Sequence, residues 1–468
     1  MYRIMILVFS LAFAQDINYS DYFTDNTLRF DYYHSGIADA EYISLDELRL
    51  ENKWPGSRKN LIDEMQLGLY RFEVLDSASG NLICAYQFAS IFGEWQTTGE
   101  ASDGVWRTFH ESQRFPEPKK PFTIILKKRN PDGSYVQIYK SDHNPQSHYI
   151  NRSQVMQSHR IWKIFESGST ENKVDILVLG DGYREDDAKQ FKKNAKHLIN
   201  VLFETEPFKA RKSDFNVWAI DVFSDETGLS NPRQNIWKRS ALGLTFNAFD
   251  SDRYVLTYEN KNLREIAAQA PYDAIFIIFN DPKYGGGGIY NLWSTVSALS
   301  SEADYVFVHE FGHSFASLAD EYYTSDVAYQ VSLPEYEPND PNVTALFDPE
   351  NLKWKHLVED GTPIPTFWDQ ASYDSIAVEY RQQRRQLIKD GASVSEMEAL
   401  TQKIDAIRKS VINDNKYYGK VGAFEGGGYL AKGIYRPEID CIMFSRNRND
   451  FCKVCLEAIE KMIDWYVK

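Results

Sequence analysis

The segment His309-Glu310-Phe311-Gly312-His313 places the strongest constraint on how this chain can fold. Residues four apart on an α-helix lie about 40° apart around its axis and about 6 Å apart along it, so His309 and His313 project from one face. Two such imidazoles can bind one metal ion through neutral ring nitrogens, and Glu310 can accept a proton from a metal-bound water. The motif predicts a helix that carries a hydrolytic zinc site. The competing interpretation is a pair of exposed histidines on an amphipathic helix.

The residues on either side of the motif predict where this helix begins and ends. Ser301-Glu302-Ala303-Asp304 has the pattern of a capping box. A catalytic zinc ion usually has three protein ligands, and Asp320 can be the third only if the helix ends near Ala316–Ser317. On an unbroken helix Asp320 would lie about 16 Å from His309. Ser317 would then occupy the turn, where left-handed geometry costs a non-glycine residue roughly 1 kcal/mol. The alternative is a solvated helix end at Asp320-Glu321.

Five segments of the chain together resemble the IgA-peptidase family of zinc metallopeptidases, which are relatives of the metzincins. They span roughly residues 165–468 and follow one another in the expected order. The resemblance implies a zinc ion bound by His309, His313 and Asp320, with Glu310 as the general base. It also implies an α/β (α+β) fold, a metzincin-like domain with a mixed sheet and an active-site helix. The segments are VDILVLGDGY (Val174–Tyr183), NVWAIDVFSDETG (Asn216–Gly228), YDAIFIIFNDPKYGGGG (Tyr272–Gly288), HEFGHSFASLADEYY (His309–Tyr323) and GIYRPEIDCIMFS (Gly433–Ser445).

Two further site features follow from this resemblance. Met443 is expected on a tight turn beneath the zinc ligands, where it would give the site an apolar floor. A buried methionine otherwise fills a core. A tyrosine that stabilises the oxyanion would be Tyr435 or Tyr429, in the glycine-rich segment before Met443.

The resemblance also predicts where substrate binds. Ile289–Ser297 matches the exposed sheet edge that precedes the zinc helix, on which substrate adds as an extended antiparallel strand. Ile289, Tyr290 and Asn291 are the predicted binding residues, and main-chain pairing would supply affinity. The alternative is an ordinary loop and edge strand.

The chain as a whole predicts a targeting segment and two folded domains. Residues 1–14 read as a signal peptide, with Arg3, the apolar run Ile4–Phe13 and a small-x-small cleavage site before Gln15. We therefore expect export to the periplasm, the cell surface or the medium, and no later apolar run is long enough to span a membrane. Residues 15–160 predict a β-sandwich-like domain, with an immunoglobulin-like sandwich as the default. Residues 161–468 predict the zinc peptidase domain, in which 372–413 forms a helical hairpin.

The four cysteines predict one disulfide. Cys84 stands alone, whereas Cys441, Cys452 and Cys455 cluster near the C-terminus. A structural zinc ion there would need a fourth ligand, and none is adjacent in sequence. We therefore expect Cys441 to pair with Cys452 or Cys455.

Composition narrows the class of partner. The net charge is 52 − 67 = −15, which argues against nucleic acid as a ligand. The sequence predicts an exported endopeptidase with one zinc ion that binds extended polypeptide. The resemblance implies immunoglobulin A or other host or extracellular proteins as candidate substrates. One alternative is a gluzincin-type peptidase with Glu425 as the third ligand. The other is a catalytically inactive, metal-stabilised binding or adhesion protein.

Overall fold

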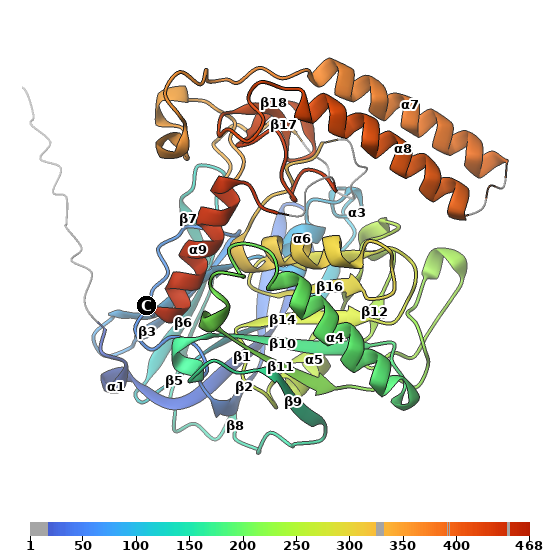
Figure 1. Ribbon diagram of the computed structural model, residues 1–468. Helices are drawn as coiled ribbons and strands as arrows, with labels where there is room; N and C mark the ends of the chain where they lie inside the picture. Colours follow the sequence, from blue (N-terminus) through green and yellow to red (C-terminus); the bar gives the residue numbers. More distant parts are fainter. Residues whose placement is uncertain (1–16, 324–331, 391, 393, 447–449) are drawn as a thin grey trace, which may run out of the picture.

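The computed structural model describes residues 17–323, 332–390, 392, 394–446 and 450–468, so the predicted signal peptide lies outside the described residues. The structure is a mixed α/β arrangement of several sheets with a β-rich N-terminal region (Figure 1). Within these described ranges, no helix is long and apolar enough to cross a membrane.

The N-terminal region contains two four-stranded sheets that share one hydrophobic core. Phe72 of the second sheet lies 6.4 Å from Phe30 and 5.2 Å from Phe115 of the first sheet, measured between ring centroids. The immunoglobulin-like topology stays a prediction. The first sheet has the order β5 (Arg107–Pro118), β1 (Phe23–Ile37), β2 (Ala40–Lys53), β8 (Ile150–Asn151), and the second β4 (Leu82–Phe88), β3 (Tyr70–Asp76), β6 (Phe122–Arg129), β7 (Tyr135–His143). Three short helices accompany them: α1 (Tyr19–Tyr22), α2 (Ile91–Trp95) and α3 (Gly99–Ser102).

A buried histidine links strands of the first sheet. His34 lies 2.9 Å from Glu41 through Nε2 and 3.0 Å from Glu111 through Nδ1, and its ring stacks on Phe92. Burial opposes the charged form, but the carboxylates of Glu111 and Glu41 outweigh it and raise the pKa of His34.

The second half of the chain is built on a six-stranded sheet whose central strands are parallel. Its two edge strands, β15 and β9, run antiparallel to their neighbours. Side chains alternate between the two faces, and both faces are covered, so the central strands are almost entirely buried. The order is β15 (Gly286–Ile289), β16 (Trp293–Ser297), β14 (Ala274–Phe279), β10 (Val174–Asp181), β11 (Phe215–Asp221), β9 (Arg160–Phe165).

The two faces of this sheet pack against different parts of the chain. Ile176 and Val178 of β10 belong to the core formed with α4 (Ala188–Leu202), α6 (Ala303–Ala316) and α9 (Lys453–Val467). Leu177 and Leu179 of the same strand face the core formed with α5 (Asn260–Ala267) and with residues of the N-terminal region. The N-terminal sheets therefore support the sheet from the side opposite to α6.

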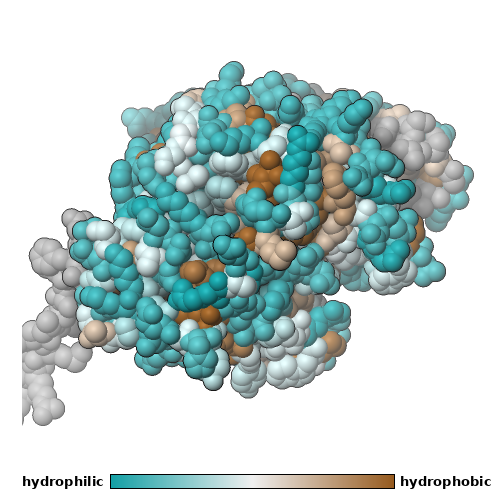
Figure 2. Space-filling model, turned by 90° about the horizontal axis from the view of Figure 1, so that it is seen from below, coloured by the Kyte–Doolittle hydropathy of each residue, from teal (hydrophilic) through white to brown (hydrophobic). Residues whose placement is uncertain are grey.

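A helical hairpin extends away from this core at the top of Figure 1. The sequence predicts it over 372–413, and the structure has α7 (Gln370–Lys389) and α8 (Val394–Asn413). The small strand pairs are β12 (Leu244–Thr245) with β13 (Leu256–Thr257) and β17 (Phe424–Gly427) with β18 (Leu430–Arg436). Figure 2 shows a predominantly hydrophilic face with small groups of hydrophobic residues, in keeping with the net charge of −15.

Candidate metal centre

Helix α6 carries the HExxH segment, but its N-terminus differs from the prediction. The N-cap is Glu302, and its side chain makes no capping hydrogen bond, so the predicted capping box is wrong. The carboxylate of Asp304, which the box requires at the helix end, instead lies 2.7 Å from Nε2 of His197 on α4. A tertiary contact has replaced the local cap.

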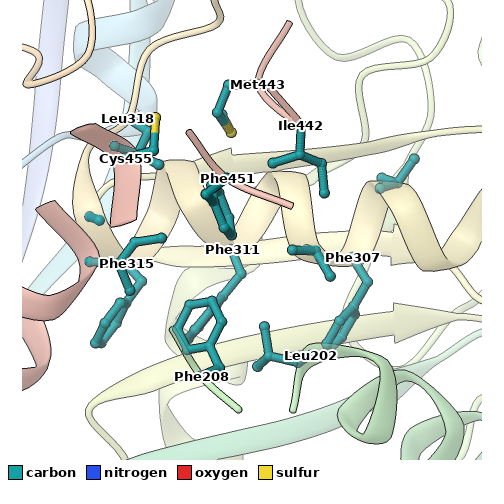
Figure 3. Close-up of a cluster of buried hydrophobic side chains, with 14 of the residues drawn as sticks. Leu202, Phe208, Phe307, Phe311, Phe315, Leu318, Ile442, Met443, Phe451 and Cys455 are labelled. Atoms are coloured by element: carbon teal, nitrogen blue, oxygen red, sulfur yellow. The ribbon is translucent and has the colours of Figure 1, made fainter. Parts of the chain in front are cut away.

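The two sides of α6 are packed differently (Figure 3). Phe307, Phe311 and Phe315 pack toward the sheet, and Phe307 stacks on Phe276 at 3.9 Å. On the other side Met443 is fully buried above Gly312, where a Cβ atom would lie only 3.1 Å from its sulfur. Met443 therefore lies against Gly312 of the helix that carries the histidines.

Three potential metal ligands converge at the C-terminal end of α6. Nε2 of His309 lies 3.1 Å from Nε2 of His313, and these two atoms lie 3.0 and 3.3 Å from Oδ1 of Asp320. A tetrahedral zinc ion with bonds of about 2.0–2.1 Å requires donor atoms about 3.3 Å apart. The three donors match that spacing.

The hydrogen bonds of the outer ring nitrogens support the same conclusion. Nδ1 of His309 lies 3.0 Å from the carbonyl oxygen of Ile442, and Nδ1 of His313 lies 2.5 Å from that of Leu318. A carbonyl only accepts, so each Nδ1 carries a proton and each ring turns its Nε2, the atom that can bind a metal ion, toward Asp320. Such outer contacts are typical of metal-binding histidines.

A sharp turn after α6 brings Asp320 to the histidines. The helix ends at Ala316, and Ser317 takes left-handed geometry at φ 52° and ψ 34°. Asn342 then holds the returning chain, because its side chain accepts from the N–H of Ala319 and donates to the carbonyl of the same residue, at 2.8 and 2.9 Å. Sequence analysis identified the turn but missed Asn342, which lies 22 residues beyond Asp320 and follows no local pattern.

The charges of the site are strongly coupled. Burial disfavours charge on His313, yet the adjacent Asp320 carboxylate raises the pKa of His313 to about 10. Burial alone would raise the pKa of Asp320, but His313 and His309 hold it well below its usual range. Burial raises the pKa of Glu310, which points into the same space without belonging to the three-donor cluster.

The structure places the two candidate tyrosines differently. The hydroxyl of Tyr429 donates to Oδ2 of Asp320, so Tyr429 lies at the site. Tyr435 lies in β18, where it pairs with Glu425 of β17, and it does not line the cleft described below. Glu425 itself is bound to Lys432 at 2.9 Å and is not part of the three-donor cluster. The geometry therefore favours Tyr429 over Tyr435 and Asp320 over Glu425.

A cleft of about 2410 Å³ opens over the three donors. One side is formed by β15 and the segment around Tyr254, and the other by the hairpin of α7 and α8. Residues of α7 and α8 that line it include Tyr380, Arg384, Met397 and Asp405.

The predicted edge strand over Ile289–Ser297 is wrong in its position. The sheet edge is β15 (Gly286–Ile289), because the chain reverses after Ile289 and returns as β16. Tyr290 and Asn291 lie in that reversal, Tyr290 is buried, and the amide of Asn291 donates to the carbonyl of Gln87. Gly286 and Gly288 of β15 can lie directly against α6 because they have no side chains: a Cβ atom on Gly288 would collide with the main chain of Glu310.

The predicted disulfide is also wrong. All four cysteines are free and buried, and Sγ of Cys441 lies 3.9 Å from Sγ of Cys455. A disulfide bond is about 2.05 Å long, so these sulfurs are not bonded.

Comparison with known protein families adds independent information. The family model described as IgA Peptidase M64 matches residues 162–463, and the model described as Peptidase M64 N-terminus matches residues 18–140. No curated protein matches the chain.

Proposed function

Because the chain belongs to the IgA peptidase M64 family, a family of metallopeptidases, we propose that it is a zinc-dependent endopeptidase with a metzincin-like catalytic domain. The proposed zinc ligands are His309, His313 and Asp320, and the proposed general base is Glu310. The observation that carries this proposal is the convergence of three potential donor atoms at 3.0–3.3 Å beside the half-buried Glu310.

The residues around the donors support hydrolysis of a peptide bond. A zinc ion held there would polarise the substrate carbonyl and lower the pKa of a bound water. Glu310 would accept a proton from a water molecule at the site and pass it to the leaving amine, a task that suits a carboxylate whose pKa burial has raised. Tyr429 acts as a positioning residue, since its hydroxyl fixes the carboxylate of Asp320.

We propose that an extended polypeptide binds along β15 rather than at Tyr290 and Asn291. The N–H and C=O of Gly286 both bond outward, to Arg253 and Val255, at 3.2 Å each. In an antiparallel strand the residue two positions on bonds in the same direction, so Gly288 presents its N–H and C=O to the cleft. Because Gly288 packs on the main chain of Glu310, a substrate strand bound there would lie beside the general base.

Immunoglobulin A or another extracellular protein is the proposed substrate, in keeping with the family description, and export is the proposed destination. An exported chain that has lost residues 1–14 would begin at Gln15, and N-terminal sequencing of secreted protein tests this directly.

The activity is tested with zinc-loaded protein and its Glu310→Gln variant. Both are incubated with immunoglobulin A and with a mixed peptide library, and new termini are identified by mass spectrometry. We expect cleavage by the unmodified protein and a loss of at least about 10²–10⁴-fold in the variant, which keeps its zinc. Equal cleavage by both proteins would remove Glu310 from the mechanism.

A further inference from the structure

A second group of potential metal ligands lies behind the first, inside the protein. It consists of Glu321, Cys441, Cys452 and Cys455, whose four ligand atoms lie within 4.8 Å of one another. All four side chains are completely buried, and none of them lines the cleft. We propose that these residues bind a second, structural zinc ion.

The distances fit a tetrahedral thiolate site and do not fit a disulfide. Sγ of Cys441 and Sγ of Cys455 are 3.9 Å apart, and Oε1 of Glu321 lies 3.2 Å from Cys455 and 3.8 Å from Cys452. With zinc–sulfur bonds of about 2.3 Å and zinc–oxygen bonds of about 2.0–2.2 Å, a tetrahedron requires separations of about 3.8 and 3.5 Å. The Cys-x-x-Cys spacing at 452 and 455 is itself common among structural zinc sites.

An unsatisfied buried oxygen of Glu321 favours a cation at this position. Oε2 of Glu321 is inaccessible to solvent and has no hydrogen-bond partner in the part of the chain that the structure describes. Its companion Oε1 accepts from the amide of Asn342 at 3.0 Å and lies 3.2 and 3.8 Å from the sulfurs of Cys455 and Cys452. A buried carboxylate with one oxygen unsatisfied is costly, and a cation would offset that cost.

The surroundings also favour thiolates. Cys452 is the N-cap of α9, where the helix end favours negative charge, and its sulfur accepts the N–H of Cys455 at 3.5 Å. The sulfur of Cys441 accepts the N–H of Cys452 at 3.2 Å. On binding, the three S–H bonds break, three protons leave to solvent and three S–Zn bonds form, with zinc remaining divalent. The divalent ion and the buried guanidinium of Arg436 then offset three of the four negative charges.

The proposed ion would fasten together the segments that build the first site. Glu321 directly follows Asp320, and its N–H donates to the carbonyl of Met443 at 2.9 Å. Cys441 lies two residues before Met443, and Cys452 and Cys455 open the C-terminal helix. Four protein ligands leave no open position, so this ion would have a structural rather than a catalytic role.

The test counts metal ions and thiols in the full chain and does not depend on hydrolysis. Native mass spectrometry of zinc-loaded protein should show two zinc ions per chain. His309→Ala/His313→Ala should retain one ion, and Cys452→Ser/Cys455→Ser should lose the thiolate-bound one. Glu321→Gln keeps the size of the side chain and removes its charge. It should weaken the binding of the second zinc ion by at least about tenfold.

Cobalt loading of the unmodified protein tests the second site without a cysteine variant, so the test remains valid if such a variant fails to fold. In unmodified protein, and in the double histidine variant, Co²⁺ should give a thiolate charge-transfer band in the near ultraviolet. Unfolding in chelator without reductant should release four thiols. Absence of the band, or two thiols instead of four, would overturn the proposal. A single ion with the thiolate band would instead contradict the histidine site, so the two failures are distinguishable.

Discussion

The turn at Ser317 gives a quantitative test of how Asp320 reaches the histidines. Ser317 holds φ 52° and ψ 34°, which costs an L-residue about 1–2 kcal/mol. Glycine avoids that cost but loses roughly 0.4–1 kcal/mol more conformational entropy on folding. Ser317→Gly should therefore raise the free energy of unfolding by about 0.5–1 kcal/mol. Ser317→Val should lower it by more than about 1 kcal/mol, because a β-branched residue is a severe outlier in this geometry.

Urea unfolding followed by circular dichroism measures these differences, and competition with a chromophoric chelator measures zinc affinity. Ser317→Gly should bind zinc as tightly as the unmodified protein, whereas Ser317→Val should bind it more weakly because the turn that delivers Asp320 is displaced. Ser375→Gly, inside helix α7, is the matched control and should destabilise by about 0.5 kcal/mol. The reasoning is refuted if Ser317→Gly destabilises like Ser375→Gly, or if Ser317→Val binds zinc normally.

Three further perturbations follow from the geometry. Asp320→Ala should weaken zinc binding at least about tenfold, whereas Glu425→Ala should leave zinc content, measured by atomic absorption, unchanged; the reverse result would favour the gluzincin arrangement. The folded-state pKa of His34 is raised, so its stabilisation is complete below about pH 6.5 and is lost as pH rises through that pKa. Above pH 6.5 the loss of this stabilisation should lower the free energy of unfolding of the unmodified protein by up to about 1.4 kcal/mol per pH unit. His34→Gln should lack this contribution to the pH dependence, and an unchanged pH profile in the variant would contradict the prediction. Gly288→Ala should reduce kcat/KM and destabilise by about 1–3 kcal/mol, because the added methyl group collides with the main chain of Glu310; wild-type kinetics would show that the sheet edge and the helix are less closely packed.

Much of the metal centre follows from local sequence. The 3.6-residue period of a helix is enough to place His309 and His313 on one face, and the distance argument for Asp320 requires the turn that the structure contains. The features that sequence reasoning missed depend on tertiary contacts. The predicted capping box is wrong, and the side chain of Asp304 instead contacts His197 on another helix. Asn342, which holds the turn before Asp320, lies in a loop that is distant in sequence.

The two other corrections have the same origin. Ile289–Ser297 was expected to be the edge strand, yet Gly286–Ile289 forms the edge, and α6 lies too close to Gly288 for any side chain there. The cysteines were expected to form a disulfide because no fourth zinc ligand is adjacent to them in sequence. Glu321 lies 120 residues before Cys441, and only the fold brings it there; its position next to Asp320 was the one available signal.

The hairpin of α7 and α8 borders the entrance to the site, whereas other elements carry the residues proposed for the chemistry. It forms one wall of the cleft, whereas the three donors and Glu310 lie on α6 and the turn after it. Under the proposed function, a polypeptide substrate would pass between that wall and the sheet edge, an opening that would favour extended linkers over compact domains. Shortening or exchanging the hairpin should therefore change which proteins are cleaved while leaving the proposed metal ligands in place.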